Sequence, residues 1–153
     1  MIRRLHLLFV FVMALFVAGC SGVVPMYEVD KAHTIDPSLT VEQIKEGILE
    51  GAQAAGWNAK VLSSGRILTT YRIRVHTVHM EIFYTDAYYQ FTYKSSNGMK
   101  MFCTEQDRLK ARNIKTSGRQ NCPGNGAPMY IHANYKKWVD SLDSAIHNSL
   151  ASM

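Results

Sequence analysis

Two closely spaced histidines and a nearby glutamate are the first side chains in this sequence whose types could support chemistry. His76 and His79 are three residues apart in an apolar, strand-like segment, and Glu81 follows. Because successive side chains of a strand point to opposite faces, the two histidines cannot share a metal ion unless a turn falls at His76. Even then no third ligand is evident, so we expect no zinc site.

The other candidate groups also lack the partner residues that catalysis would require. Glu81 is the only carboxylate in the long predicted strands, which argues against the paired carboxylates of a glycoside hydrolase. His132, near the start of a predicted C-terminal helix, is interpreted as a packing and hydrogen-bonding residue rather than a general base. The sequence contains no Gly-x-Ser-x-Gly elbow, His-Glu-x-x-His helix or phosphate-binding glycine loop. We therefore expect no enzyme, no cofactor and no bound metal.

The first 19 residues have the composition of a secretory signal. Arg3 and Arg4 precede an apolar run that is too short to span a bilayer, which needs about 20 residues. Residues 17–20 read Val-Ala-Gly-Cys, which resembles the lipobox of bacterial lipoproteins. The resemblance implies cleavage after Gly19, diacylglycerol on the Cys20 sulfur, and an acyl chain such as palmitate on the new amino terminus. The alternative is an ordinary cleaved signal with an incidental cysteine.

The residue after Cys20 bears on location. In enteric lipoproteins an aspartate at this place favours retention in the inner membrane. By that similarity, Ser21 points to the outer membrane of a Gram-negative bacterium, with the protein facing the periplasm.

Composition limits the mature chain to one modest domain. Removing residues 1–19 leaves 134 residues (153 − 19), and the formal charge falls from +5 to +3 with the loss of Arg3 and Arg4. A nucleic-acid-binding protein would carry a denser basic stripe, so we expect no nucleic-acid partner. We divide the chain into a signal peptide over residues 1–19, a lipidated tether over 20–39, and a single domain over 40–153.

Cys103 and Cys122 remain once Cys20 is assigned to the lipid. An even pair in an oxidising compartment favours a disulfide. A metal site is the competing interpretation, but two distant thiols without a Cys-x-x-Cys motif lack zinc spacing. The same missing motif argues against redox catalysis.

The tether leads into a helix that begins after Thr40. The tether carries Pro25 and Pro37 and shows no periodicity, although its valines could instead form an edge strand. Thr40 and Gln43 form a capping box, and Gly56 is placed to end the helix. Within it, glycines at 47 and 51 either allow close approach to a sheet or are simply tolerated.

Residues 57–95 alternate as strands do, and their parity locates a break. Apolar residues are odd-numbered up to Val75 and even-numbered from Val78. Because strand side chains alternate, we predict a turn at His76-Thr77 rather than a bulge. A further turn at Asp86-Ala87 leads to a strand over 88–94 with Tyr89, Phe91 and Tyr93 facing inward. Asn97-Gly98 predicts a hairpin that returns residues 99–103 antiparallel to that strand.

The remainder is a polar, basic segment and a helix. Residues 104–128 include Arg108, Lys110 and Arg119, and we interpret them as a solvated loop rather than a binding patch, because acids are interleaved. Apolar residues recur at helical spacing from about Asn134 to Leu150. The aromatic face of this helix fits a packed core better than a ligand-binding box.

The face of the sheet opposite the helices is expected to be open and of mixed charge. The candidate interaction surface combines residues of this face with the basic segment: Arg72, Arg74, His79, Glu81, Arg108, Lys110 and Arg119.

Several short motifs in order resemble a family of small, uncharacterised proteobacterial outer-membrane lipoproteins. They are Trp57 after a helix, Arg-Val-His at 74–76, Met-Glu-Ile-Phe-Tyr at 80–84, Tyr93 before Ser-Ser-Asn, and Ile-His-Ala-Asn-Tyr-Lys-Lys-Trp-Val at 131–139. The resemblance covers Thr40 to Ile146 and the lipobox. It implies no activity and no catalytic residue, and the segment between Cys103 and Cys122 departs from the pattern.

These patterns predict an α+β, two-layer domain. An antiparallel sheet of four to five strands carries an N-terminal and a C-terminal helix on one face. For function we expect a non-catalytic envelope lipoprotein that contacts a protein or cell-wall partner. The alternative is a periplasmic small-ligand or lipid carrier with a pocket lined by Trp57, Tyr71, Phe91 and Trp138.

Overall fold

A computed structural model describes residues 22–26, 32–111, 122 and 127–153. The predicted signal peptide, the predicted lipidation site Cys20 and the candidate surface residue Arg119 lie outside the described residues.

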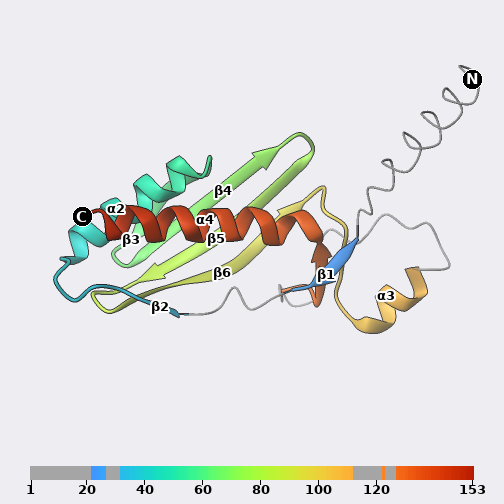
Figure 1. Ribbon diagram of the computed structural model, residues 1–153. Coiled ribbons are helices and arrows are strands. Elements are labelled where there is room, and N and C mark those ends of the chain that lie inside the picture. The colour runs from blue at the N-terminus through green and yellow to red at the C-terminus, as the bar shows by residue number, and fades with distance from the viewer. Residues whose placement is uncertain (1–21, 27–31, 112–121, 123–126) are drawn as a thin grey trace, which may run out of the picture.

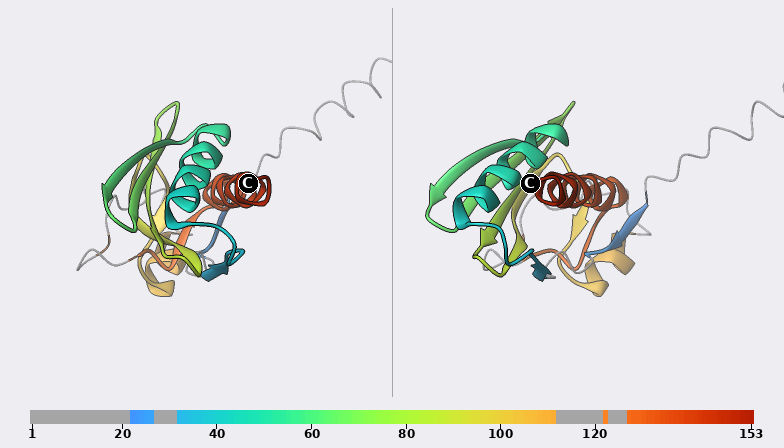
Figure 2. Two further views of the ribbon diagram at one scale, coloured as in Figure 1. Left: turned by 90° about the vertical axis from the view of Figure 1, so that its left-hand side faces the viewer. Right: turned by 60° about the vertical axis from the view of Figure 1, so that its left-hand side comes forward.

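The main sheet has five antiparallel strands in the order β2-β6-β5-β4-β3. The strands are β2 (Ala32–Thr34), β3 (Asn58–Ser63), β4 (Arg66–Ile73), β5 (His76–Tyr84) and β6 (Tyr88–Asn97) (Figure 1). Two helices, α2 (Val41–Ala54) and α4 (Ala133–Ala151), lie side by side on one face of this sheet (Figure 2). This arrangement confirms the predicted α+β, two-layer fold.

The core lies between the two helices and the sheet. It contains the even-numbered apolar residues of β5 and the inward residues of β6, as the parity pattern predicts. The residues exposed by 1 % or less include Ile44, Ile48, Ile67, Val78, Met80, Ile82, Tyr89, Phe91, Tyr135, Leu142 and Ile146.

Helix α2 begins where its capping box predicts. The Thr40 hydroxyl accepts a hydrogen bond from the Gln43 N–H at 3.3 Å, and the Gln43 side chain accepts from the Thr40 N–H at 3.0 Å. These bonds satisfy backbone donors that the first helical turn leaves free. The chain turns after Ala55 at Gly56, whose φ of +78° suits glycine, as predicted.

The glycines of α2 allow a close approach, but the neighbour is α4 rather than a sheet. A Cβ at Gly51 would lie 2.4 Å from the Ile146 Cα, and one at Gly47 would lie 2.6 Å from the Leu150 Cδ2. The two helices therefore touch backbone to backbone at Gly51. The prediction of close approach is correct, and the predicted partner is wrong.

The β4–β5 hairpin forms, but its turn is at Arg74-Val75 instead of the predicted His76-Thr77. Arg74 adopts a φ of +54°, a conformation that non-glycine residues rarely take. Because the turn comes earlier, Val75 lies outside the sheet and is 75 % exposed. The expected inward position of Val75 is wrong for that reason.

The hairpin predicted at Asn97-Gly98 is absent from the structure. Residues β7 (Met101–Phe102) pair with β8 (Tyr130–His132) instead of β6, and β8 pairs in turn with β1 (Val23–Pro25) to form a second, three-stranded sheet. A Cβ at Gly98 would lie 2.1 Å from the Val75 carbonyl oxygen. The absence of a side chain at Gly98 therefore allows its backbone to pass close to the backbone of Val75. The chain leaves the main sheet at this point.

Part of the expected tether is folded. β1 pairs with β8, and β2 pairs with β6 at the edge of the main sheet. His33 in β2 stacks on Tyr89 with ring centroids 4.8 Å apart, and Asp143 of α4 accepts a hydrogen bond from the Tyr89 hydroxyl at 2.9 Å. Ile35 is only 9 % exposed and belongs to the core. The boundary drawn at residue 40 is therefore wrong, because the domain extends back to β1.

The predicted disulfide is formed, with the sulfur atoms of Cys103 and Cys122 2.02 Å apart. After Cys103 the chain forms a short helix, α3 (Glu105–Ala111), where a loop was predicted. Thr104 helps to start it, since its hydroxyl accepts a hydrogen bond from the Asp107 N–H at 3.1 Å. The cap and the acids of its first turn favour this helix locally.

Candidate interaction surface

The face of the main sheet turned away from α2 and α4 is the largest part of the predicted surface in the described chain. Strand register places Thr70 beside His79, and Leu68 beside Glu81, which in turn pairs with Thr92. Directly paired residues of antiparallel strands share a face. Arg72, His79 and Glu81 are therefore on one surface, as predicted, and we call it the open sheet face.

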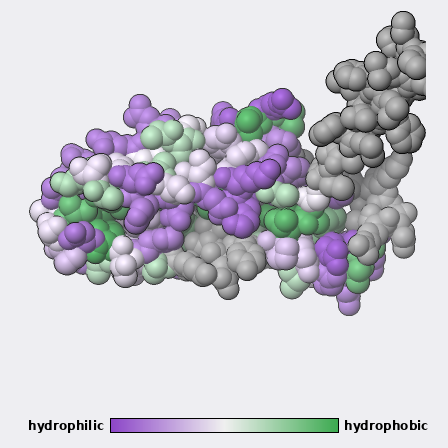
Figure 3. Space-filling model, in the orientation of Figure 1, coloured by the Kyte–Doolittle hydropathy of each residue, from purple (hydrophilic) through white to green (hydrophobic). Residues whose placement is uncertain are grey.

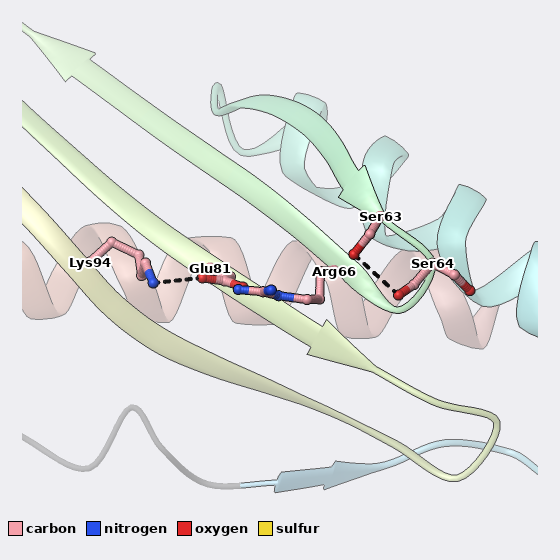
Figure 4. A network of polar contacts seen from close by, with 5 residues as sticks. All are labelled: Ser63, Ser64, Arg66, Glu81 and Lys94. Carbon is pink, nitrogen blue, oxygen red and sulfur yellow. Dashed lines mark hydrogen bonds and ion pairs between the residues drawn. The ribbon is translucent and has the colours of Figure 1, made fainter.

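Glu81 lies at the centre of the open sheet face and joins three strands. Its carboxylate forms ion pairs with Arg66 of β4 and with Lys94 of β6, the latter at 2.9 Å (Figure 4). The register of β6 shifts between the partners of His79 and Met80, so Lys94 is the extra residue of a bulge. This bulge lets β6 present a cation to the neighbouring strand.

The three charged groups differ in their exposure to water. Glu81 is 7 % exposed, whereas the side chains of Arg66 and Lys94 are about half exposed, at 50 % and 47 %. The hydrogen bond from Lys94 lowers the pKa of Glu81, and Arg66 lowers it further, against the opposing effect of burial. Glu81 is thus held as an ion with both partners engaged, which suits a structural link better than proton transfer.

A polar groove opens at the β3–β4 side of the open sheet face. It has a volume of about 460 Å³ and is lined by Gly56, Asn58, Thr70 and Arg72. The Thr70 hydroxyl is 3.0 Å from Nδ1 of His79, so the groove wall connects with the histidine of the next strand. One guanidinium, an amide and a hydroxyl are the groups that bind a carboxylate or another hydrogen-bonding anion.

The rest of the predicted surface residues lie elsewhere. Arg74 is in the β4–β5 turn, and Arg108 and Lys110 are on α3. Arg108 pairs with Glu105 and lies over the Tyr130 ring, with 5.0 Å to the ring centroid. The predicted set therefore divides into the open sheet face and a separate group near the second sheet.

The four aromatic residues predicted to line a ligand pocket do not gather around a common space. The Tyr71 ring contacts both Trp57 and Trp138, with ring centroids 5.2 and 5.3 Å apart. Phe91 instead packs against Tyr89 at 5.7 Å. The predicted pocket lining thus divides between two groups of ring contacts. The indole N–H of Trp57 is buried and has no hydrogen-bond partner among the described residues.

This ring stack continues into two histidines. The His76 ring is 5.9 Å from Trp138 and 5.7 Å from His132. Nδ1 of His76 donates to the Gly98 carbonyl at 2.8 Å, and Nδ1 of His132 accepts from the Asn134 N–H at 3.2 Å, which caps α4. The prediction of a packing and hydrogen-bonding role for His132 is confirmed.

The surroundings of His132 also favour the neutral form of its ring. Burial lowers its pKa, and the nearby His76 and Lys100 lower it further. A neutral ring keeps the Nδ1 lone pair that the helix cap requires. The cap and the lowered pKa are therefore parts of one arrangement.

Sequence reasoning missed Arg66, Asn58 and Thr70. Parity could have found Arg66 and Thr70, since both are even-numbered in β4 like Arg72. Asn58 carries no such signal, because its position depends on how β3 pairs with β4. Trp57, Tyr71 and Trp138 were predicted to lie together, as part of a pocket lining, but the continuation of their ring stack into His76 and His132 was missed.

Within the described ranges, no three or more histidine, cysteine, aspartate or glutamate residues are placed to hold a metal ion. The described helices include none with the length and apolar character needed to cross a bilayer. Comparison of the chain with family models, with curated proteins and with solved structures gave no match.

Proposed function

We propose that this chain is a non-catalytic lipoprotein of the cell envelope, anchored through lipid at Cys20, whose domain binds a partner through the open sheet face. The observation that carries the proposal is the state of this face: no described helix covers it, and it contains a polar groove beside Arg72. The central carboxylate, Glu81, is engaged by two cations.

The anchor is supported by the sequence and fits the disulfide. A basic start, a short apolar run and Val-Ala-Gly-Cys together resemble a lipoprotein signal. A bond between Cys103 and Cys122 suits an oxidising compartment such as the periplasm. Because Ser21, and not an aspartate, follows Cys20, similarity to enteric lipoproteins supports a location at the periplasmic face of the outer membrane.

The partner is an envelope protein or a cell-wall component that offers a carboxylate. Arg72 supplies a planar guanidinium that can hold a carboxylate by two parallel hydrogen bonds. Asn58 and Thr70 add neutral donors next to it. A single cation gives modest affinity in water, so contacts along the rest of the face must contribute.

Site-specific photocrosslinking in intact cells tests the binding face. A crosslinking amino acid at Asn58 or Thr92, both exposed on the open sheet face, should capture a discrete partner. The matched control is Lys137, exposed on α4. Arg72→Glu should remove the product at Asn58. Equal capture from all three positions, or none from the sheet, would reject the open sheet face as the binding surface.

Mass spectrometry of the protein from its native envelope tests the anchor separately. We expect a mature amino terminus at an acylated Cys20. An unmodified terminus at another residue would exclude the lipid anchor while leaving the crosslinking result independently interpretable.

A further inference from the structure

The distance from the predicted lipid to the fold is short. Only Ser21 and Gly22 separate Cys20 from Val23, the first residue of β1. Three Cα–Cα steps of about 3.8 Å span at most about 11 Å. Val23 pairs with His132, and the Gly22 carbonyl accepts a hydrogen bond from the Ala133 N–H at 3.0 Å. A lipid on Cys20 would therefore hold this end of the domain against the bilayer.

Some exposed apolar side chains also lie at this end. The β4–β5 turn reaches it, because His76 contacts His132, the strand partner of Val23. Figure 1 shows this turn, β1 and α3 at one end of the molecule, and Figure 3 shows hydrophobic residues on the surface there. The exposed large apolar residues at this end are Ile73 at 38 %, Val75 at 75 %, Leu109 at 47 % and Met129 at 51 %. Elsewhere in the described chain, the exposed large apolar residues are Val41, Val61, Leu62, Phe83 and Met153.

The charges at this end are mainly positive. Arg72, Arg74, Lys100 and Lys110 are all exposed. The acids here belong to α3, and one of them, Glu105, pairs with Arg108. The opposite end carries Asp36, Glu42 and Asp86, where the Ile35 N–H donates to the Ala87 carbonyl at 3.0 Å. The molecule is thus polarised along its length.

We propose that the end formed by Ile73, Arg74, Val75, Leu109, Lys110 and Met129 lies on the membrane as a second attachment beside the lipid. We call it the membrane-facing end. The proposal rests on the lipid anchor proposed above. Apolar side chains among cations suit the interface between headgroups and acyl chains, and the cations attract anionic headgroups. The domain would then stand in a fixed orientation, with the acidic end directed away from the bilayer.

Depth-dependent quenching tests this orientation. Full-length lipidated protein would be reconstituted in vesicles of phosphatidylethanolamine and phosphatidylglycerol containing brominated acyl chains. An environment-sensitive fluorophore would be attached at Val75→Cys or, as the control, at Ser64→Cys in the exposed β3–β4 turn. We expect roughly twofold or stronger quenching at position 75 and none at 64, because only residues at the interface approach the acyl chains. Equal behaviour of the two labels would overturn the proposal.

Charge removal supplies a second measurement. Arg74→Gly suits the positive φ of that turn, and with Lys110→Gln it removes two cations. Each cation near an anionic bilayer strengthens contact by about fivefold, so quenching of a label at Met129→Cys should fall strongly. The control pair, Lys45→Gln and Lys60→Gln, should leave it unchanged. A fall of the same size in both variants would contradict the electrostatic part.

The two proposals fail in different ways. Protein that carries no acyl chain and does not float with the vesicles would refute the anchor and, with it, the membrane-facing end. Acylated protein that floats, but whose two labels respond alike, would refute the membrane-facing end alone.

Discussion

Glu81 is the residue on which the open sheet face is built. It is nearly buried on a face without helices, and two cations from neighbouring strands reach it. Its carboxylate therefore holds β4, β5 and β6 together from the side opposite the core. The charge of Glu81 links neighbouring strands. Its contribution to the free energy of unfolding depends on how far water screens Arg66 and Lys94.

Replacing this carboxylate should cost stability without unfolding the protein. We expect Glu81→Gln to lower the free energy of unfolding by about 1.5 kcal/mol, since charged hydrogen bonds are lost while the half-exposed cations stay solvated. Chemical denaturation at neutral pH measures it. Asp86→Asn in the exposed β5–β6 turn is the control and should change little.

Acid should remove the same contribution in the wild-type protein. The pKa of Glu81 is lowered from 4.5 in the fold, so the unfolded chain takes up the proton first as pH falls. The stabilisation is therefore present above about pH 4.5 and is lost below it. Glu81→Gln should show a weaker decline in this range, and an identical decline would contradict the assignment.

His132 predicts a second pH dependence, in a milder range. Its pKa is lowered from 6.5, so the unfolded state binds a proton more readily than the folded state. Stability should fall as pH drops below about 6.5, because protonation also removes the Nδ1 acceptor that caps α4. His132→Asn keeps a capping oxygen without a titrating group. The midpoint of thermal unfolding, followed between pH 7.5 and 5.5, should fall less in this variant than in wild type.

At the scale of elements, the contact between α2 and α4 depends on small residues. A methyl group at Gly51 meets the backbone of α4, whereas one at Gly47 meets the end of the Leu150 side chain. Gly51→Ala should destabilise by about 2 kcal/mol, because backbone yields less than a side chain. Gly47→Ala should cost less, since leucine can change rotamer and alanine favours the helix by about 1 kcal/mol. Thermal denaturation of both variants would contradict this geometry if the order were reversed.

The disulfide between Cys103 and Cys122 closes a loop that begins directly after β7. Cys103 and Cys122 are 19 residues apart, and closing such a loop contributes about 3 kcal/mol through the entropy of the unfolded chain. The double variant Cys103→Ser, Cys122→Ser should lose about that much in equilibrium denaturation. Adding a reductant should lower wild-type stability and leave the double variant unaffected. Insensitivity of the wild type would show that the bond contributes nothing.

Elements with a long periodic signal were predictable, and those defined by distant pairing were not. The capping box at Thr40 and the parity change before Val78 involve residues that are close in the sequence. Both could therefore be predicted from the sequence alone. The turn at Arg74 was misplaced because arginine carries no signal for a positive φ. The prediction at Asn97-Gly98 failed for the opposite reason. Gly98 does adopt the positive φ that this pair favours, but the conformation allows a close approach to the Val75 backbone instead of a hairpin turn.

At the scale of the whole molecule, the two-layer fold could be predicted from the order of the strands and helices along the chain. The second sheet could not be predicted in this way. Its strands β1, β7 and β8 have only two or three residues each and come from three distant parts of the chain. Segments so short have no readable period. The open sheet face was predictable by alternation, whereas its groove and the membrane-facing end needed the actual register and the position of α3.

The extent of the domain can be tested by shortening the chain. A variant that begins at Thr40 lacks β1, β2 and the buried Ile35, and it should lose about 3 kcal/mol or more of unfolding free energy. A variant that begins at Gly22 should retain nearly all of it. Urea denaturation compares the two. Equal midpoints would show that β1, β2 and Ile35 add nothing to the stability of the domain.

The pairing of β1 with β8 also determines how a mechanical load would travel. A pull on the amino terminus arrives first at the Gly22–Ala133 hydrogen bond and at Val23, opposite His132. β8 continues without a break into α4, which runs the length of the five-stranded sheet. Tension would therefore pass along the axis of this helix, and the three-residue strand would peel away before any strand of the larger sheet separates.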